Sequence, residues 1–173
     1  MKIVDTAEFV EEVARYDIGF DTGYPHPQTL GFQNGHLFEM SIPRDINGTG
    51  TLIAQLLEIY EDIEPLWVWR RSGTWVPSQW DLDGWRGSVI RGLEGLGLPL
   101  AQGAIRCDSS DKRLLPAMLL LWASVQRSVD DDVFLVGTEK LPVAWIDHDG
   151  ELFLDCASEE AVFVFRSHFA HWL

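Results

Sequence analysis

The stretch VAWIDHDGELFLD, residues 143–155, decides the fold because it carries the clearest β-hairpin pattern in the chain. Apolar residues lie on both sides of Asp149-Gly150, a dipeptide that favours the tight turns between antiparallel strands. We therefore expect residues 143–147 to pair with residues 151–155. The short β-rich run 133–136 precedes this hairpin and is expected to form another strand.

A second hairpin is predicted at 66–77, where two β-rich runs flank Ser72-Gly73. Between and around the strands, apolar residues recur at helical spacing, and capping residues precede most of these segments. This pattern predicts four to five helices. They are a short helix from Asp5, one that starts at Thr49 or Thr51 and stops at Pro65, one from Asp81 or Asp83 to Gly97, an apolar helix over 114–126, and a C-terminal helix from Ser158.

The remaining segments complete an α+β fold. Residues 17–35 are rich in Gly and Pro and are expected to form a long loop before a strand at 36–42. Residues 161–165 also suit a strand, although the helix from Ser158 is preferred. Because hairpins and helices do not alternate as regular βαβ units, we predict a mainly antiparallel sheet in a single domain, residues 1–173.

Charge is segregated along the chain. Residues 1–64 carry 12 acids against 3 bases, and residues 128–160 carry 10 acids against Lys140 alone. The middle, residues 65–127, holds 8 of the 13 Lys and Arg and 6 of the 8 tryptophans. An acidic body around a basic, aromatic middle is typical of a protein that binds a basic partner or grips a ligand with aromatic faces. Solubility alone is the plainer reason for an acidic surface.

The overall composition excludes several classes of protein. With 46% hydrophobic residues and 23% charged residues, the chain is globular rather than disordered. A net charge of −14 disfavours nucleic acid and anionic membranes as partners, because both are bound through Lys and Arg.

The cysteine pattern and the N-terminus predict a cytoplasmic location. Cys107 and Cys156 are isolated, which fits a reduced compartment better than a disulfide framework. The start of the sequence shows no apolar segment of the kind found in secretory signals. The longest apolar run, 114–125, is too short to cross a bilayer.

The first candidate site is a group of carboxylates near the 143–155 hairpin: Asp130, Asp131, Asp132, Asp147, Asp149, Glu151 and Asp155. If the 133–136 strand lies beside the hairpin, several of these side chains converge at one end of the sheet. Their field would speed the approach of a basic partner. The alternative is that 130–132 forms a solvated turn and that Asp149 serves only the hairpin turn.

The second candidate site is the aromatic and basic segment 67–86. Alternation places its strand residues on two faces: Trp67, Trp69 and Arg71 on one, Arg70 and Trp75 on the other. One face then belongs to the core, and the other offers an Arg stacked on an indole. Ordinary packing is the alternative role of the tryptophans.

Motifs for metals, cofactors and catalysis are missing from the sequence. His168 and His171 are three residues apart, and the hairpin before them carries Asp147, His148, Asp149 and Cys156, but no zinc-binding spacing connects these residues. Asp81 and Asp83 begin like a calcium loop, which then lacks its required ligands. The chain has no phosphate-binding loop, dinucleotide fingerprint or nucleophile elbow. We predict no metal and no cofactor, and a non-enzymatic protein is favoured.

The sequence therefore favours an acidic binding protein that neutralises or regulates a basic protein partner, such as a toxin. Its profile is similar to that of bacterial immunity and inhibitor proteins, although no motif identifies a family. The residues expected at the interface are the carboxylates Asp130, Asp131, Asp132, Asp147, Asp149 and Glu151, with one or two of Trp67, Trp75 and Trp80 as anchors.

The alternative function is a small-molecule-binding domain or enzyme built on the same middle segment. In it, Arg70, Arg71 and Arg86 would hold a carboxylate or phosphate. Trp75 or Trp80 would stack on a ring of the ligand, and Asp81 or Asp83 would act as the base. This alternative requires a pocket bordered by those residues.

Overall fold

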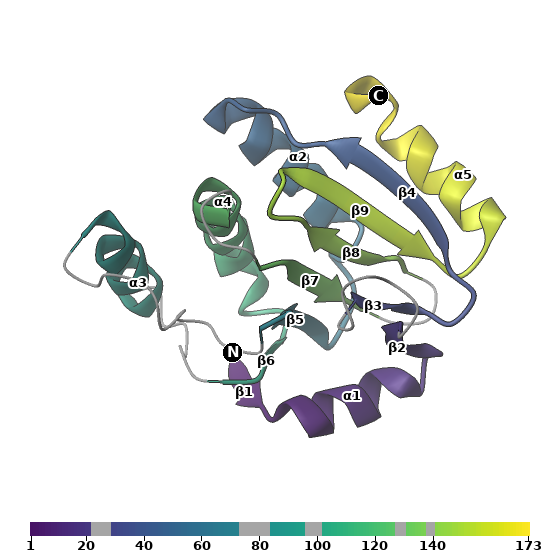
Figure 1. The fold of residues 1–173 in the computed structure, drawn as a ribbon, viewed down its shortest axis with the longest axis horizontal. Helices are drawn as coiled ribbons and strands as arrows, with labels where there is room; N and C mark the ends of the chain where they lie inside the picture. Colours follow the sequence, from purple (N-terminus) through teal and green to yellow (C-terminus); the bar gives the residue numbers. More distant parts are fainter. Residues whose placement is uncertain (22–28, 73–83, 96–101, 127–130, 138–140) are drawn as a thin grey trace.

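The computed structural model describes residues 1–21, 29–72, 84–95, 102–126, 131–137 and 141–173 (Figure 1). The strands are β1 (Lys2–Val4), β2 (Ile18–Asp21), β3 (Thr29–Phe32), β4 (His36–Ser41), β5 (Leu66–Arg70), β6 (Ala104–Cys107), β7 (Val133–Val136), β8 (Val143–Ile146) and β9 (Glu151–Cys156). The helices are α1 (Thr6–Ala14), α2 (Ile46–Glu58), α3 (Trp85–Gly95), α4 (Leu115–Gln126) and α5 (Glu159–His168), with short 3-10 turns at Lys112–Leu114 and Ala170–Trp172.

Seven of the strands form one sheet in the order β1-β6-β5-β7-β8-β9-β4, and every neighbouring pair is antiparallel. The strands β2 and β3 form a separate two-stranded sheet. This arrangement confirms the predicted α+β class with a mainly antiparallel sheet.

Alternation along the strands divides the core between the two faces of the large sheet. On one face, Leu66 and Val68 of β5 belong to a buried cluster that includes apolar residues of α2, α4 and the C-terminal segment. On the other face, Trp67 and Trp69 belong to a second cluster with Phe9 of α1 and residues of β2 and β3. The central strands are buried on both sides, which explains their nearly continuous apolar sequences.

The first and last α-helices begin at the predicted capping residues. The side chain of Asp5 accepts a hydrogen bond from the backbone N–H of Ala7 at 2.8 Å. The hydroxyl of Ser158 accepts one from the N–H of Ala161 at 3.2 Å. Because Ser158 satisfies a free N–H of the first turn, residues 161–165 are helical, and the strand alternative is wrong.

The start of α2 was predicted too late in the sequence. Asp45 is its N-cap and accepts a hydrogen bond from the N–H of Gly48 at 2.8 Å. Thr49 and Thr51 lie inside the helix, where their hydroxyls donate to backbone carbonyls one turn earlier. The Asn47-Gly48 pair, a common turn signal, is tolerated within the first helical turn.

The helices α3 and α4 were expected, and α4 is the main helix of the core. It buries Met118, Leu119 and Trp122, while Pro116 lies exposed in its first turn, where a missing N–H costs nothing. The caps predicted for α3, Asp81 and Asp83, lie outside the described residues. None of the helices in the described part of the chain has the length and apolar character needed to cross a membrane.

The 143–155 hairpin forms in the predicted register. Val143 pairs with Asp155 and Ile146 with Leu152. The turn contains His148, Asp149 and Gly150, and Gly150 has φ 93°, a value that only glycine adopts at little cost. The predicted position of Asp149-Gly150 therefore fixes both the turn and the strand pairing.

One sequence prediction needs correction, and another is tested only in part. Residues 17–35 are not a simple loop, because β2 and β3 pair with each other through four residue pairs. In the 66–77 segment, β5 is a central strand that pairs with both β6 and β7. The second strand of that predicted hairpin, 74–77, lies outside the described residues.

Candidate binding site at one end of the large sheet

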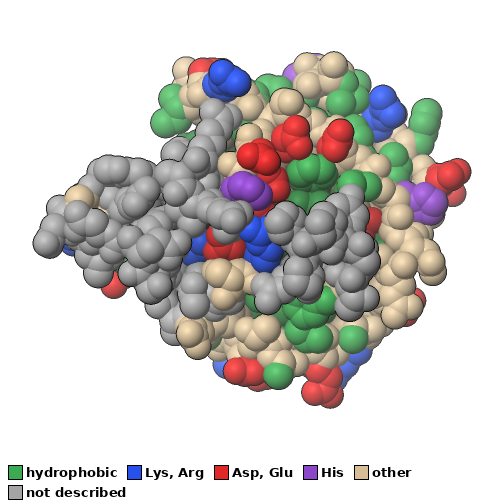
Figure 2. Space-filling view, in the orientation of Figure 1, with side chains coloured by type: hydrophobic (Ala, Val, Ile, Leu, Met, Phe, Trp, Pro, Cys, Tyr) green, Lys and Arg blue, Asp and Glu red, His purple; other side chains and the backbone are tan. Residues whose placement is uncertain are grey.

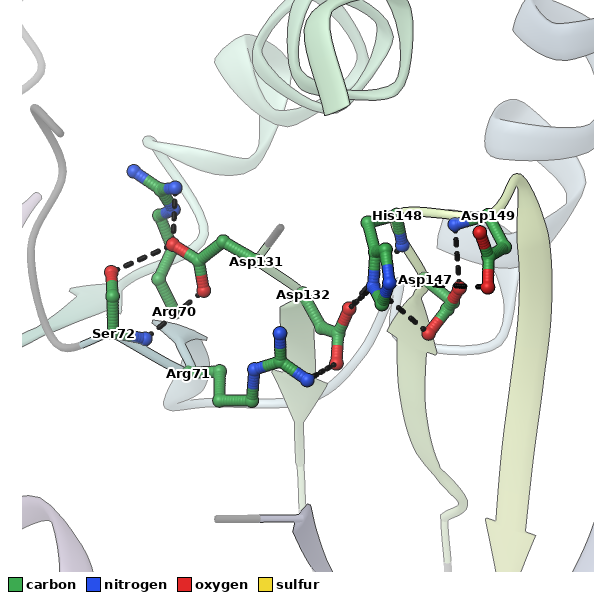
Figure 3. Close-up of polar contacts among 8 residues, drawn as sticks. All are labelled: Arg70, Arg71, Ser72, Asp131, Asp132, Asp147, His148 and Asp149. Atoms are coloured by element: carbon green, nitrogen blue, oxygen red, sulfur yellow. Dashed lines mark hydrogen bonds and ion pairs between the residues drawn. The ribbon is translucent and has the colours of Figure 1, made fainter. Parts of the chain in front are cut away.

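Three neighbouring strands bring a set of charged residues to the same end of the sheet (Figure 3). Because β5 and β7 are antiparallel, the residues that follow β5 lie beside those that precede β7. The turn after β8 reaches the same end. Figure 3 shows the charged and polar side chains gathered there: Arg70, Arg71, Ser72, Asp131, Asp132, Asp147, His148 and Asp149.

On the helix-covered face of the sheet, Arg70 and Asp131 form a buried ion pair. Their side chains are 1% and 4% exposed. Asp131 also accepts hydrogen bonds from the backbone N–H and the hydroxyl of Ser72, at 3.0 and 2.7 Å. The guanidinium of Arg70 lies over the ring of Trp122 at 4.2 Å. Burial lowers the pKa of Arg70, and the charge of Asp131 opposes this shift.

On the opposite face, Asp132 connects Arg71 to His148. Its carboxylate lies 3.1 Å from the guanidinium of Arg71 and 3.0 Å from Nδ1 of His148. The backbone N–H of His148 also donates to it at 3.3 Å. Burial raises the pKa of Asp132, and Asp147 adds to the rise, whereas His148 and Arg71 oppose it. This buried carboxylate therefore ties the β8–β9 turn to β5.

The same turn holds its own acidic side chains in place. The N–H of Asp149 donates to the carboxylate of Asp147 at 2.6 Å, and the N–H of Asp147 donates to the carbonyl of Glu151 at 2.8 Å. The side chain of Asp149 is 82% exposed, whereas that of Asp147 is 17% exposed. The turn is thus fixed at its base and presents Asp149 to solvent.

The structure divides the carboxylates predicted for the interface. Asp131 and Asp132 are buried and ion-paired, so they are part of the interior and not of an open acidic surface. Asp147, Asp149 and Glu151 lie at the surface. Asp155 is buried and accepts a hydrogen bond from the N–H of Phe32, which attaches β3 to β9. Asp130 lies outside the described residues.

The aromatic and basic segment also has an internal role where it is described. The predicted alternation is confirmed, with Trp67 and Trp69 in one cluster and Arg70 on the other face. The indole stacked on Arg70 is that of Trp122, far along the sequence. The residues predicted as anchors or ligands that lie outside the described positions or side chains are Trp75, Trp80, Asp81, Asp83 and Arg86.

Glu39 of β4 joins the surface carboxylates, and sequence reasoning missed it. Ser41 pairs with Glu151 and Glu39 with Phe153, so Glu39 and Glu151 project from the same face on adjacent strands. Figure 2 shows acidic side chains gathered near a histidine over this part of the sheet. We call Glu39, Asp147, Asp149 and Glu151 the acidic corner. The outward alternation of residues 37–41 was visible in the sequence, but the pairing of β4 with β9 was not.

One group of side chains could share a metal ion. Ligand atoms of Asp132, Asp147 and His148 all lie within 4.8 Å of one another. Arg71 already supplies a positive charge to Asp132, which opposes the entry of a cation. Of the residues that the sequence analysis considered for a metal, Asp147 and His148 belong to this group, and His168 and His171 do not.

Fold and site together define a single α+β domain whose charged network is largely internal and whose acidic corner lies at the surface. No protein-family model, curated protein or solved structure matches the chain. Function is therefore inferred from the chemistry of the site alone.

Proposed function

We propose that the protein is a non-enzymatic binding protein that engages a basic protein partner through the acidic corner. The observation that carries this proposal is the concentration of uncompensated charge there. Among the described residues, no Lys or Arg forms an ion pair with Glu39, Asp147, Asp149 or Glu151. The ring of His148 lies 3.5 Å from Asp147 and 3.9 Å from Asp149, and it adds a positive charge only when it is protonated.

The acidic corner is also held rigidly before any partner arrives. The strands β8 and β9 are paired along their length, and Asp132 fixes His148 from the neighbouring strand. A carboxylate on a fixed turn loses little conformational freedom on binding, so more of its electrostatic energy contributes to affinity. This supports a preformed surface for a basic partner over a flexible acidic tail.

The charge of the whole chain favours the same class of partner. With a net charge of −14, the protein attracts basic proteins over distances limited by the Debye length, about 8 Å at physiological salt. Such steering raises association rate constants from roughly 10⁵–10⁶ toward 10⁸–10⁹ M⁻¹s⁻¹ at low salt. An inhibitor or immunity protein that must capture a basic toxin quickly would benefit from this rate.

The positions of Arg70 and Arg71 weaken the alternative proposal of a small ligand bound by arginines. Both guanidiniums form ion pairs with aspartates of the protein, and the side chain of Arg70 is 1% exposed. Arg70, expected to bind a small ligand, and Asp131, expected to bind a protein partner, therefore form an ion pair with each other inside the protein.

A cytoplasmic location forms part of our proposal, and two buried cysteines without a disulfide support it.

The experiment that tests the proposal is capture from native lysate with a matched pair of charge variants. The first variant neutralises the acidic corner: Glu39→Gln, Asp147→Asn, Asp149→Asn and Glu151→Gln. The control variant removes the same charge from exposed positions on other elements: Glu8→Gln, Glu11→Gln, Glu58→Gln and Asp62→Asn. Bound proteins are identified by mass spectrometry, and the association rate of each purified partner is measured across a range of salt.

The expected result is a basic partner that binds the wild type and the control variant but is lost by the acidic-corner variant. Its association rate should fall steeply with salt because the attraction is screened. A partner that both variants retain equally, or an association rate independent of salt, would contradict the proposal.

A further inference from the structure

One edge of the large sheet is open for pairing. β4 is the last strand, and its six residues pair only with β9. In an antiparallel edge strand, every second residue directs its N–H and C=O groups away from the sheet. Within the part of the chain that the structure describes, no hydrogen bond forms on the outer side of residues 36–41.

The sequence of β4 lacks two common protections of an edge strand, proline and lysine. Native edges are commonly short, interrupted by proline, marked by charged side chains, lysine above all, or covered by a helix or loop. β4 reads HLFEMS, with neither residue, and it is as long as β9. Its single charged side chain is Glu39, which repels acidic segments and attracts basic ones.

Apolar side chains stand exposed on both sides of this edge. Leu37 of β4 is 43% exposed on the face that carries Glu39. On the other face, α5 runs beside β4 at the outer edge of the sheet (Figure 1). The guanidinium of Arg166 lies 6.0 Å from the ring of Phe38, while His168 on the other flank of α5 contacts Gln55 of α2.

The spacing of α5 places Phe163 on the flank of the helix that carries Arg166, away from the flank that carries His168. It precedes Arg166 by three residues, so the two side chains project from the same side of the helix one turn apart. Its side chain is 72% exposed, the most exposed of the large hydrophobic residues in the described part of the chain. A strand added beside β4 would therefore have Phe163 on one face and Leu37 and Glu39 on the other.

We propose that the open edge of β4 receives an extended, basic segment of the partner protein as an additional strand. Backbone hydrogen bonds to β4 would supply affinity, and side chains on alternate faces would supply specificity. Apolar residues of the segment contact Leu37 and Phe163, and a Lys or Arg contacts Glu39. This inference rests on the proposed function and specifies how the basic partner binds.

Charge favours a basic segment over a second copy of the chain as the strand that pairs with β4. Pairing two β4 strands about Glu39 would place the two Glu39 side chains opposite each other, beside the acidic corners of both copies. Like charges at directly opposed positions destabilise a strand pair. A net charge of −14 on each copy adds to the repulsion.

The test uses a blocked Val-rich peptide with Lys at every fourth position as the probe, so that Val lies on both faces of the added strand and Lys on the face of Glu39, and the full ¹⁵N-labelled chain as the target. Chemical shifts and amide exchange of residues 36–41 report strand addition, and the same peptide with Glu in place of each Lys is the matched probe. The variants Leu37→Lys and Phe163→Lys place a repelling charge at the edge. Ile46→Lys, at a site on α2 that is 66% exposed, is the matched control.

We expect the Val/Lys peptide to protect outward amides of β4 and to lose affinity by about tenfold or more in either edge variant, with Ile46→Lys unchanged. Absence of shifts in residues 36–41, equal binding of the Val/Glu peptide, or a dimer that pairs through β4 would overturn the inference. Capture of a partner that needs the acidic corner but tolerates Leu37→Lys and Phe163→Lys would overturn only the inference and leave the proposed function standing.

Discussion

The guanidinium carbon of Arg70 lies 4.2 Å from the centroid of the Trp122 ring, so β5 and α4 share one buried cation. Asp131 neutralises that cation from the segment that leads into β7. Three parts of the chain that are distant in sequence are thus joined by one charged group. The buried acids and arginines at this end of the sheet therefore stabilise the fold, and the acidic corner is the part of the site that a partner can contact.

Removal of Asp131 should therefore destabilise the protein strongly. In an Asp131→Ala variant, the guanidinium of Arg70 stays buried without its main counter-charge. The free energy of unfolding should fall by about 3–5 kcal/mol, as is typical when one partner of a buried ion pair is removed. Urea unfolding monitored by circular dichroism measures the change. Glu12→Ala, which removes an exposed ion pair with Arg15, is the control and should change stability by less than about 0.5 kcal/mol.

A double variant checks the physical reason for that loss. Arg70→Met combined with Asp131→Leu removes both charges at similar volume, and it should lose clearly less free energy of unfolding than Asp131→Ala alone. A double variant as unstable as the single one would show that lost packing around Trp122, and not an unpaired charge, dominates.

The predictable part of the fold is the part set by local sequence. Asp5 and Ser158 cap helices through neighbours two or three residues away, and Gly150 supports a turn within its own hairpin. Each of these features depends on bonds within a few residues, so a single sequence contains the information. The order of the strands depends on contacts between distant segments, which no local pattern encodes.

The candidate site shows the same division. Alternation correctly separated Arg70 from Trp67 and Trp69, because side-chain direction in a strand is local. The counter-ions Asp131 and Asp132 could not be assigned, because their pairing follows from β5 lying beside β7. For the same reason, Glu39 was missed although its own strand was expected.

Two glycine substitutions should have opposite effects. A Cβ added at Gly35 would overlap the carboxylate of Asp155, which is held by the N–H of Phe32 at 2.7 Å. We expect Gly35→Ala to lower the free energy of unfolding by about 1–3 kcal/mol, as overpacking commonly does.

Gly50 lies in α2 with open space at the Cβ position, so Gly50→Ala should raise the free energy of unfolding by up to about 1 kcal/mol. Thermal unfolding compares the two, and a neutral Gly35→Ala would contradict the close approach.

The stability contributed by Asp132 should increase on acidification. Burial raises the pKa of this carboxyl above its ordinary value of 3.8. Between 3.8 and the raised value, the folded protein holds a proton that the unfolded chain has released, so the free energy of unfolding rises as pH falls through that interval.

Comparison with Asp132→Asn isolates this effect. The stability of the wild type relative to Asp132→Asn should increase between neutral pH and pH 3.8. A relative stability that declines over this range would mean that the ion pair with Arg71 outweighs the cost of burial.

Both cysteines should resist alkylation until the protein unfolds. Burial raises the pKa of Cys107 to about 12 and that of Cys156 to about 12, and the Asp155 carboxylate adds to the second shift. Because the thiolate is the reacting species, iodoacetamide should label the folded protein on the order of a thousandfold more slowly than the protein in urea. An exposed control, Ser110→Cys, should gain one thiol that reacts at similar rates in both states. Rapid labelling of Cys107 or Cys156 in the folded wild type would show that the sheet opens locally far more often than its burial implies.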